Sequence, residues 1–349
     1  MALVIPAIKG NVLFFRSSTP VVVGVSILWT ACTGNGHRVA EVDPVPLTVT
    51  IERLDHALFH TTLDSATSDR LYARFGGFYR TYIEDILQGA PLEDPRLPLV
   101  LARFVNDPDW SAAQHTVDSV FGGMEREEEM FSNAFGRLQA LFPDSLVPRV
   151  VTFNSGYNFG IFPTDSVLGV GMEWFIGKDH PVIAMLAPDA FPNFMKDRMV
   201  PAMLVPSAMK GWLLVHYTRD IRGQDVLTNL VETGKVMALL EALLPDAPAP
   251  DRFAFTPDQL AWCAANESLV WKEIVAKEKL FSKDPEDIGR LMNDGPFTNG
   301  LPRESPGHIG EWIGYRMVTA YLHAHPETTF AQLFAQEDPR VILKEYKPR

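Results

Sequence analysis

The chain has 349 residues and a formal net charge of −12, with 31 Lys and Arg against 43 Asp and Glu. Such an acidic chain repels phosphate backbones, so nucleic acid is excluded as an expected partner. Hydrophobic residues make up 46% of the chain, enough for a sizeable core, and the only cysteines, Cys32 and Cys263, exclude a disulfide framework and a thiolate metal cluster.

The first 31 residues have the layout of a secretory signal. Lys9 and Arg16 precede an apolar run over residues 20–31, which ends at Cys32. This run is too short to span a membrane, which takes about 20 residues. The ending resembles a bacterial lipoprotein signal, in which the cysteine becomes the mature N-terminus and carries acyl chains, although Trp29 stands where Leu is usual. We predict a lipoprotein signal peptide over 1–31, lipid attachment at Cys32 and a tether over 32–45; a plain signal peptide with an incidental cysteine is the alternative.

The first half of the chain combines strand and helix patterns. Residues 46–52 alternate apolar and polar side chains, which predicts a strand, and helical spacing follows over 65–88. Shorter helical stretches lead to a helix over 124–142, whose first turns are acidic, as the helix dipole favours. Residues 148–154 and 166–172 are predicted strands, separated by turns that contain Gly and Pro.

After Pro188 the pattern is helical to the end of the chain. The predicted helices cover residues 202–217, 224–244, 257–280, 285–292, 307–323 and a short turn near Phe330. No repeat and no change of composition marks an internal boundary. We therefore predict a single, predominantly helical α+β domain with one small sheet over residues 46–349.

Common catalytic motifs are missing from the sequence. We find no dinucleotide loop, Walker loop or Gly-x-Ser-x-Gly elbow. His56 and His60 stand four residues apart and would share a helix face, which provides two ligands of a metal site. The sequence identifies no third ligand, so a pair of surface or partly buried histidines is the favoured interpretation.

The segment from Trp212 to His216, with Glu232 sixteen residues later, matches half of a zinc-peptidase pattern. The full pattern, His-Glu-x-x-His, needs a first histidine and a general-base glutamate, and here those positions hold Trp212 and Leu213. His216 and Glu232 are thus vestigial candidates, and no catalytic residue, metal or cofactor is assigned.

Several segments, in order, resemble the gliding-motility lipoprotein B (GldB) family of Bacteroidetes. The resemblance is strongest over 150–335 and rests on residues 175–181, 191–198, 205–212, 232–237, 242–246, 255–267, 293–298 and 304–314. It implies lipid anchoring, in agreement with the interpretation of Cys32. The chain also distantly resembles a family of zinc peptidases, and this resemblance implies a zincin-like domain without the metal.

Two features of these segments suggest physical roles. Gly310 and Gly314, four residues apart on a predicted helix, permit a close helix crossing. Phe297, Thr298 and Asn299 lie in a predicted exposed turn that carries an aromatic residue, and we expect a partner contact there.

Three functions follow as hypotheses. The favoured one is a non-enzymatic lipoprotein of the cell envelope, facing the periplasm, that supports gliding motility or its associated secretion machinery through envelope protein partners. The alternative is a metal-dependent, peptidase-like hydrolase with an atypical or degenerate zinc site. A weaker third is a ligand-capturing lipoprotein with a helical cleft lined by Trp212, His216 and Tyr217.

Overall fold

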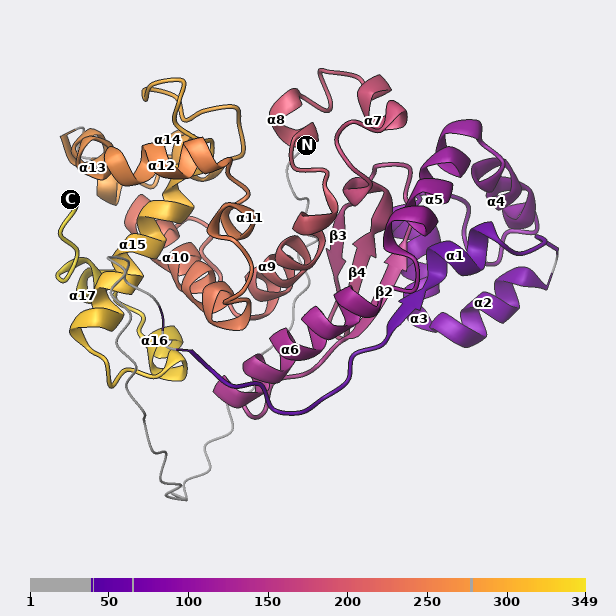
Figure 1. The fold of residues 1–349 in the computed structure, drawn as a ribbon, viewed down its shortest axis with the longest axis horizontal. Helices are drawn as coiled ribbons and strands as arrows, with labels where there is room; N and C mark the ends of the chain where they lie inside the picture. Colours follow the sequence, from indigo (N-terminus) through magenta and orange to yellow (C-terminus); the bar gives the residue numbers. More distant parts are fainter. Residues whose placement is uncertain (1–38, 40, 65, 277–278) are drawn as a thin grey trace.

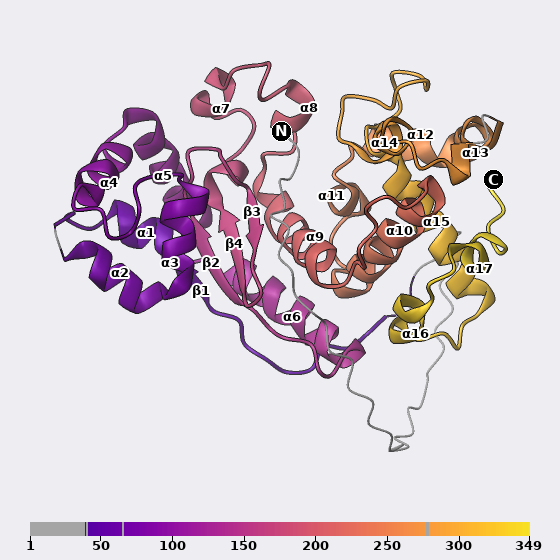
Figure 2. The same cartoon turned by 180° about the vertical axis from the view of Figure 1, so that it is seen from behind.

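The structure is a computed structural model that describes residues 39, 41–64, 66–276 and 279–349 (Figure 1). The predicted signal peptide, Cys32 and the first part of the predicted tether lie outside the described residues. Figures 1 and 2 show a small sheet with the helices of the first hundred or so residues on one side and the C-terminal helices gathered on the other.

Four strands form the sheet, in the order β1-β2-β4-β3. β1 (Ile51–Arg53) and β4 (Val167–Gly171) both pair with β2 (Arg149–Phe153) in parallel, and β3 (Ile161–Pro163) pairs with β4 antiparallel. Every residue of β4 is buried, and β2 is buried from Val150 onward. Continuous apolar runs of this kind are typical of strands covered on both faces.

The sheet separates two hydrophobic cores. Val151 and Phe153 of β2 face a smaller core, while Val150 faces a larger one, because successive side chains of a strand point to opposite faces. The smaller core is formed with α1 (Leu54–Phe59), α2 (Thr67–Phe75), α3 (Gly77–Thr81), the π-helical turn Tyr82–Ile86 and α4 (Leu97–Val105).

The larger core is built around α10 (Val226–Leu243), which is buried along almost its whole length. Packed around it are α6 (Glu125–Leu141), α9 (Leu204–His216), α14 (Pro285–Met292), α15 (Ile309–Ala324), α16 (Phe330–Ala335) and α17 (Pro339–Leu343). The remaining helices are α5 (Pro108–Phe121), α7 (Pro181–Met185), α8 (Asn193–Lys196), α11 (Ala249–Phe253), α12 (Pro257–Ala265) and α13 (Glu267–Ala276), with 3₁₀ turns at 172–175, 201–203 and 279–281.

The segment that leads into β1, residues 42–51, is hydrogen-bonded along α6. Arg137 donates a hydrogen bond to the carbonyl of Val42 (3.0 Å), and the amide of Val45 donates to the carbonyl of Gly136 (3.1 Å). Further along, the amide of Val49 donates to the hydroxyl of Ser132 (2.9 Å), and the amide of Ile51 donates to the Oε1 of Glu128 (2.8 Å). We call residues 42–51 the strap.

The prediction of a helical α+β chain with a small sheet is confirmed, as are the strands at 148–154 and 166–172. The strand predicted over 46–52 was wrong in extent: only residues 51–53 join the sheet, because the preceding residues bond to α6 instead. The long helix predicted over 65–88 is interrupted at Gly76, whose φ of +62° no helix allows. The helix predicted over 257–280 is likewise two helices, separated at Asn266.

Of the helices in the described part of the chain, none combines the length and the apolar character that a membrane crossing requires.

Candidate functional site

His216 lies at the C-terminal end of α9, where the incomplete zinc pattern placed it, but it has a structural partner. Its Nε2 donates a hydrogen bond to the carbonyl of Thr164 (3.0 Å), and its ring lies 3.8 Å from the ring of Trp212. Burial lowers the pKa of His216, because it penalises the charged imidazolium, and the hydrogen bond to Thr164 partly opposes this effect. Trp212 is only 1% exposed and packs edge-on against Phe135. It therefore belongs to the core and cannot line the helical cleft of the third hypothesis, which was wrong in this respect.

Glu232, on α10, is held by cations and not by His216. Its Oε1 accepts hydrogen bonds or ion-pair contacts from Lys235 (2.9 Å) and Arg219 (3.1 Å). Lys235 is fully buried and also donates to the carbonyl of Gln336 (2.7 Å). Burial lowers the pKa of Lys235, and the neighbouring carboxylate of Glu232 partly opposes this effect. Within the described residues, His216 and Glu232 join no cluster of three metal-ligating side chains.

The turn at 297–299, where we expect a partner contact, is less exposed than predicted. Thr298 is 1% exposed, and its hydroxyl donates to the carbonyl of Pro306 (2.7 Å). Phe297 is half-buried, and Asn299 is exposed. The prediction that the whole turn is exposed was therefore wrong, because the Thr298 hydroxyl turns inward to satisfy a buried carbonyl.

Polar side chains gather instead at the carboxyl edge of the parallel strands. Asp55 follows β1, Asn154 and Ser155 follow β2, and Glu173 follows β4. In open sheets with parallel strands, this edge is where ligand sites form, since the strand ends bring loops from distant parts of the chain together.

Asp55 is the centre of a buried hydrogen-bond network. It accepts from Thr152 (2.5 Å), from Gln114 (2.9 Å) and from Arg53 (2.6 Å), and it is 1% exposed. Burial alone would raise the pKa of Asp55, but these bonds, above all those from Arg53, lower it. The amide of Asn154 extends the network by donating to Gln114 (3.4 Å).

Glu173 is the second buried carboxyl of this edge. Its Oε1 accepts from the amide and the hydroxyl of Ser155 (2.7 Å each) and from the amide of Tyr157 (3.1 Å), whereas its Oε2 has no hydrogen-bond partner among the described residues. Burial, only partly opposed by these bonds, raises the pKa of Glu173 to about 7. A carboxyl group with this pKa can hold a proton near neutrality, a property that occurs both at functional sites and in structural networks.

A cavity of about 250 Å³ opens beside this edge, next to Ser155. Its walls are mostly apolar and include Trp110, Phe104 and Leu101, together with Asn158. This volume lies below the range of about 300–1,000 Å³ typical of drug-sized ligands, so only a small molecule would fit.

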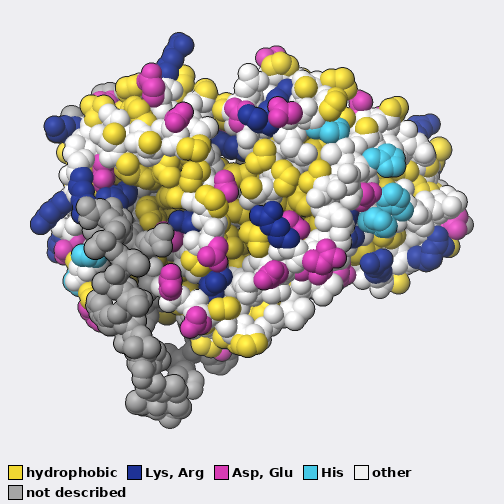
Figure 3. Space-filling model, viewed as in Figure 1, with side chains coloured by type: hydrophobic (Ala, Val, Ile, Leu, Met, Phe, Trp, Pro, Cys, Tyr) yellow, Lys and Arg dark blue, Asp and Glu magenta, His cyan; other side chains and the backbone are white. Residues whose placement is uncertain are grey.

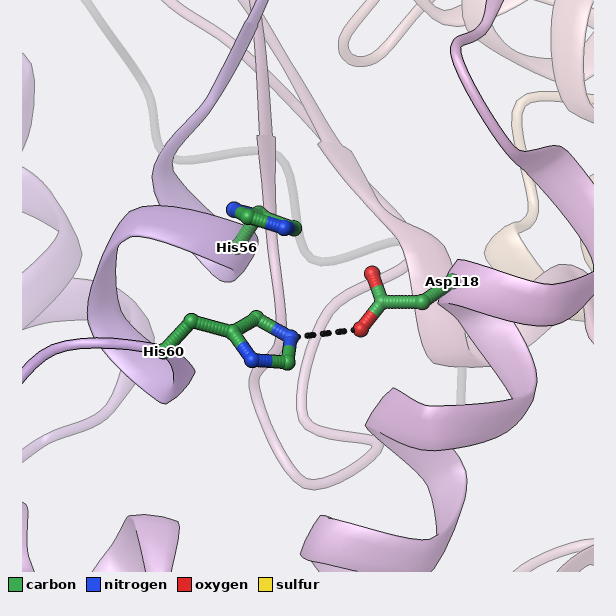
Figure 4. Close-up of side chains that lie close together, drawn as sticks. All are labelled: His56, His60 and Asp118. Carbon is green, nitrogen blue, oxygen red and sulfur yellow. Dashed lines mark hydrogen bonds and ion pairs between the residues drawn. The ribbon is translucent and has the colours of Figure 1, made fainter.

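The side chains of His56, His60 and Asp118 lie close together (Figure 4), with both histidines exposed and Asp118 partly buried. Arg53 and Gln114, which bond to Asp55, also donate to Asp118 and so connect the cluster to the Asp55 network. His56 and His60 come from one turn around the end of α1, and Asp118 comes from α5. The Nε2 of His60 donates to the Oδ2 of Asp118 (2.6 Å), and the two imidazole centroids are 4.3 Å apart. Figure 3 shows histidine side chains on this face of the molecule, over α1 and α5.

A sequence profile of the family described as gliding motility protein GldB matches residues 35–348. The chain belongs to this family. The match extends well beyond residues 150–335, where the sequence resemblance was strongest, and it includes α1, α5 and the whole sheet. No curated protein and no solved structure gives a significant match, so these comparisons lend no support to a zincin-like relationship.

Sequence reasoning identified His56 and His60 in this GldB family member but missed Asp118, Asp55, Gln114 and Glu173. Asp118 is 58 residues from its partner His60, and nothing in the sequence pairs them. A usable signal did exist for Asp55 and Glu173, since each follows the end of a parallel strand within two residues. The predicted strands 46–52 and 166–172 end within three residues of Asp55 and Glu173, but local patterns did not show that the two strands share a sheet through β2.

Proposed function

We propose that the chain is a non-enzymatic lipoprotein, held on a bacterial envelope membrane by acyl chains at Cys32, that supports gliding motility or its associated secretion machinery. The observation that carries this proposal is the match to the GldB family over residues 35–348, nearly the whole predicted mature chain.

The anchor is supported by the signal-like sequence before Cys32. A formal net charge of −12 gives the chain no electrostatic attraction to anionic lipid, so a covalent lipid would supply the membrane affinity. We propose that the domain faces the periplasm, because residues 33–37 (Thr-Gly-Asn-Gly-His) are short, neutral and without the charged signal of surface export. Envelope proteins of the gliding or secretion machinery would be its partners.

The absence of peptidase activity is supported by the surroundings of α9. Trp212 and Leu213 occupy the positions of the first zinc ligand and the general base, and both are buried in the core. The carboxylate of Glu232 forms ion pairs with Lys235 and Arg219. A zincin-like ancestry is consistent with α9 packing against the antiparallel edge strand β3, and we propose it as the origin of the incomplete pattern. A metal-dependent hydrolase would need a site elsewhere in the chain.

The test uses Cys32→Ala and the unmodified chain, each expressed in a gliding host that lacks its own copy. We expect the unmodified chain to fractionate with membranes and to cross-link to envelope proteins, and Cys32→Ala to appear in the soluble fraction with gliding lost. A soluble unmodified chain would remove the anchor. Failure of the unmodified chain to restore gliding, together with the absence of any cross-linked partner, would remove the machinery role.

Trp212→Phe serves as the matched control, since it preserves an apolar ring at the first ligand position. It should leave membrane attachment and gliding unchanged.

A further inference from the structure

We propose that His56, His60 and Asp118 bind one divalent transition-metal ion, with Zn²⁺ as the best fit. This site is separate from α9 and goes beyond the proposed function, because it assigns a ligand to a surface that the family description does not mention.

The geometry is close to that of a metal site. One ligand atom from each of the three side chains lies within 4.8 Å of the others. Around a tetrahedral Zn²⁺ with bonds of about 2.0–2.2 Å, neighbouring ligand atoms are about 3.3–3.6 Å apart. The contact of 2.6 Å between His60 and Asp118 would therefore widen, and the imidazole of His56 would move inward, both through side-chain rotation at the exposed surface.

The ligand set matches this ion chemically. Two imidazoles and one carboxylate are ligands that Zn²⁺ accepts, and hard cations such as Mg²⁺ and Ca²⁺ prefer oxygen alone. His56 and His60 are exposed, so a water molecule can fill a fourth position. Three protein ligands with an open position distinguish this arrangement from a closed, purely structural zinc site.

The carboxylate of Asp118 is already oriented by hydrogen bonds from residues outside the cluster. Its Oδ1 accepts from Arg53 (2.9 Å) and Gln114 (3.2 Å), which leaves Oδ2 directed toward His60. Such outer hydrogen bonds orient metal ligands and affect metal affinity by about 10–100-fold. The positive charge of Arg53 opposes a cation, but Asp55, which contacts the same guanidinium at 2.6 Å, offsets it.

The fold itself brings the three side chains of the cluster together. α1 begins directly after β1, so the strand end fixes where His56 and His60 stand, and α5 packs against α1. A bound ion would bridge α1 and α5 at the carboxyl edge of the sheet, next to the buried network of Asp55 and Gln114.

The test is a titration of the purified full chain, stripped with a chelator, with ZnCl₂ by isothermal titration calorimetry. We expect one ion per chain for the unmodified protein, and no binding for His60→Ala or Asp118→Ala. Gln114→Ala should weaken binding by about 10-fold, because Asp118 loses one of its outer partners. His115→Ala is the matched control: His115 is exposed on the same helix as Asp118 and outside the cluster, so binding should be unchanged.

Two further readouts make the outcome decisive. Titration with CoCl₂ should produce the visible absorption bands of tetrahedral Co²⁺ in the unmodified chain and in His216→Ala, but not in His56→Ala. His56 is exposed, so its replacement leaves the core intact, as circular dichroism can verify. Absence of binding to the unmodified chain would overturn the proposal, as would binding by His56→Ala or His60→Ala that is as tight as that of the unmodified chain. Loss of the bands in His216→Ala alone would place the ion on α9 and overturn it as well.

Discussion

Gly234 of α10 and Gly314 of α15 lie backbone against backbone where the two helices cross. A Cβ added to Gly234 would overlap the backbone of Gly314, and one added to Gly314 would overlap the carbonyl of Leu230. The close crossing predicted from the glycines of α15 is therefore confirmed. Because the obstructing atoms are backbone, no side-chain rotation can relieve such an overlap.

Gly314→Ala should destabilise the protein strongly. Overpacking a tight contact costs about 1–3 kcal/mol, and we expect the upper end here because the helices themselves must separate. Urea denaturation followed by circular dichroism measures the change. Gly77→Ala is the control, since a Cβ there meets nothing within 4 Å, and its free energy of unfolding should stay the same or rise slightly. Equal stability of the two variants would contradict the close crossing.

Glu173→Gln should change the pH dependence of stability. The pKa of Glu173 is raised from 4.5 to about 7 in the folded chain, so the folded state binds more protons than the unfolded state between these values. Its contribution to stability is fully present below pH 4.5 and is lost as the pH rises through 7. Between pH 4.5 and pH 8, the free energy of unfolding of Glu173→Gln should therefore rise by roughly 3 kcal/mol relative to that of the unmodified chain. The exposed Glu304→Gln should give a profile parallel to that of the unmodified chain, and a parallel profile for Glu173→Gln would disprove the assignment.

Glu232→Gln should destabilise the chain because it leaves the buried ammonium of Lys235 without its counter-charge. Breaking a buried ion pair on one side typically costs about 3–5 kcal/mol. The double variant Glu232→Leu with Lys235→Met should recover most of that loss, since apolar residues of similar volume replace both charges. Asp220→Asn, which breaks an exposed pair with Arg222, should have no measurable effect. Thermal and urea denaturation report all three; a neutral Glu232→Gln would show that Lys235 does not depend on this carboxylate.

Cysteine labelling should distinguish the two cysteines. Burial raises the pKa of the Cys263 thiol to about 12, so it should not react with iodoacetamide in the native state. If Cys32 carries a lipid through its sulfur, native protein from the membrane contains no reactive thiol, and urea should expose one. Mass spectrometry counts the modified residues. Labelling of one cysteine in the native state would indicate a free Cys32 thiol and count against the anchor.

Local patterns predicted the elements whose partners are nearby or whose apolar runs are continuous. β2 and β4 were identified because both faces are covered, and α14 was placed at its observed bounds because Asp284 and Pro285 mark its start. Residues 46–50 of the strap were mistaken for part of a strand. An extended, alternating segment has the same pattern whether its amides bond to a neighbouring strand or, as here, to side chains of a helix. β3 was missed because three residues ending in proline are too short to show a period.

The candidate site was predictable only in part. The spacing of His56 and His60 was visible in the sequence, but their contact with Asp118 depends on how α5 packs against α1. Likewise, the pattern from Trp212 to His216 could not show that the indole of Trp212 is buried in the core or that the imidazole of His216 donates to the carbonyl of Thr164. Contacts of this kind arise from tertiary packing, which local sequence patterns do not encode.

The strap also determines how the domain would bear mechanical load. A pull on the N-terminal side of Val42 would first meet the bonds from Arg137 and from Val45 to Gly136, and then those of Val49 and Ile51 to α6. Beyond them, tension runs along β1, which is bonded in parallel to β2, so the ladder would be loaded in shear with several hydrogen bonds sharing the force. If the chain is anchored at Cys32, as we propose, a force on its N-terminus would thus break the bonds between the strap and α6 one after another before it reached the sheet.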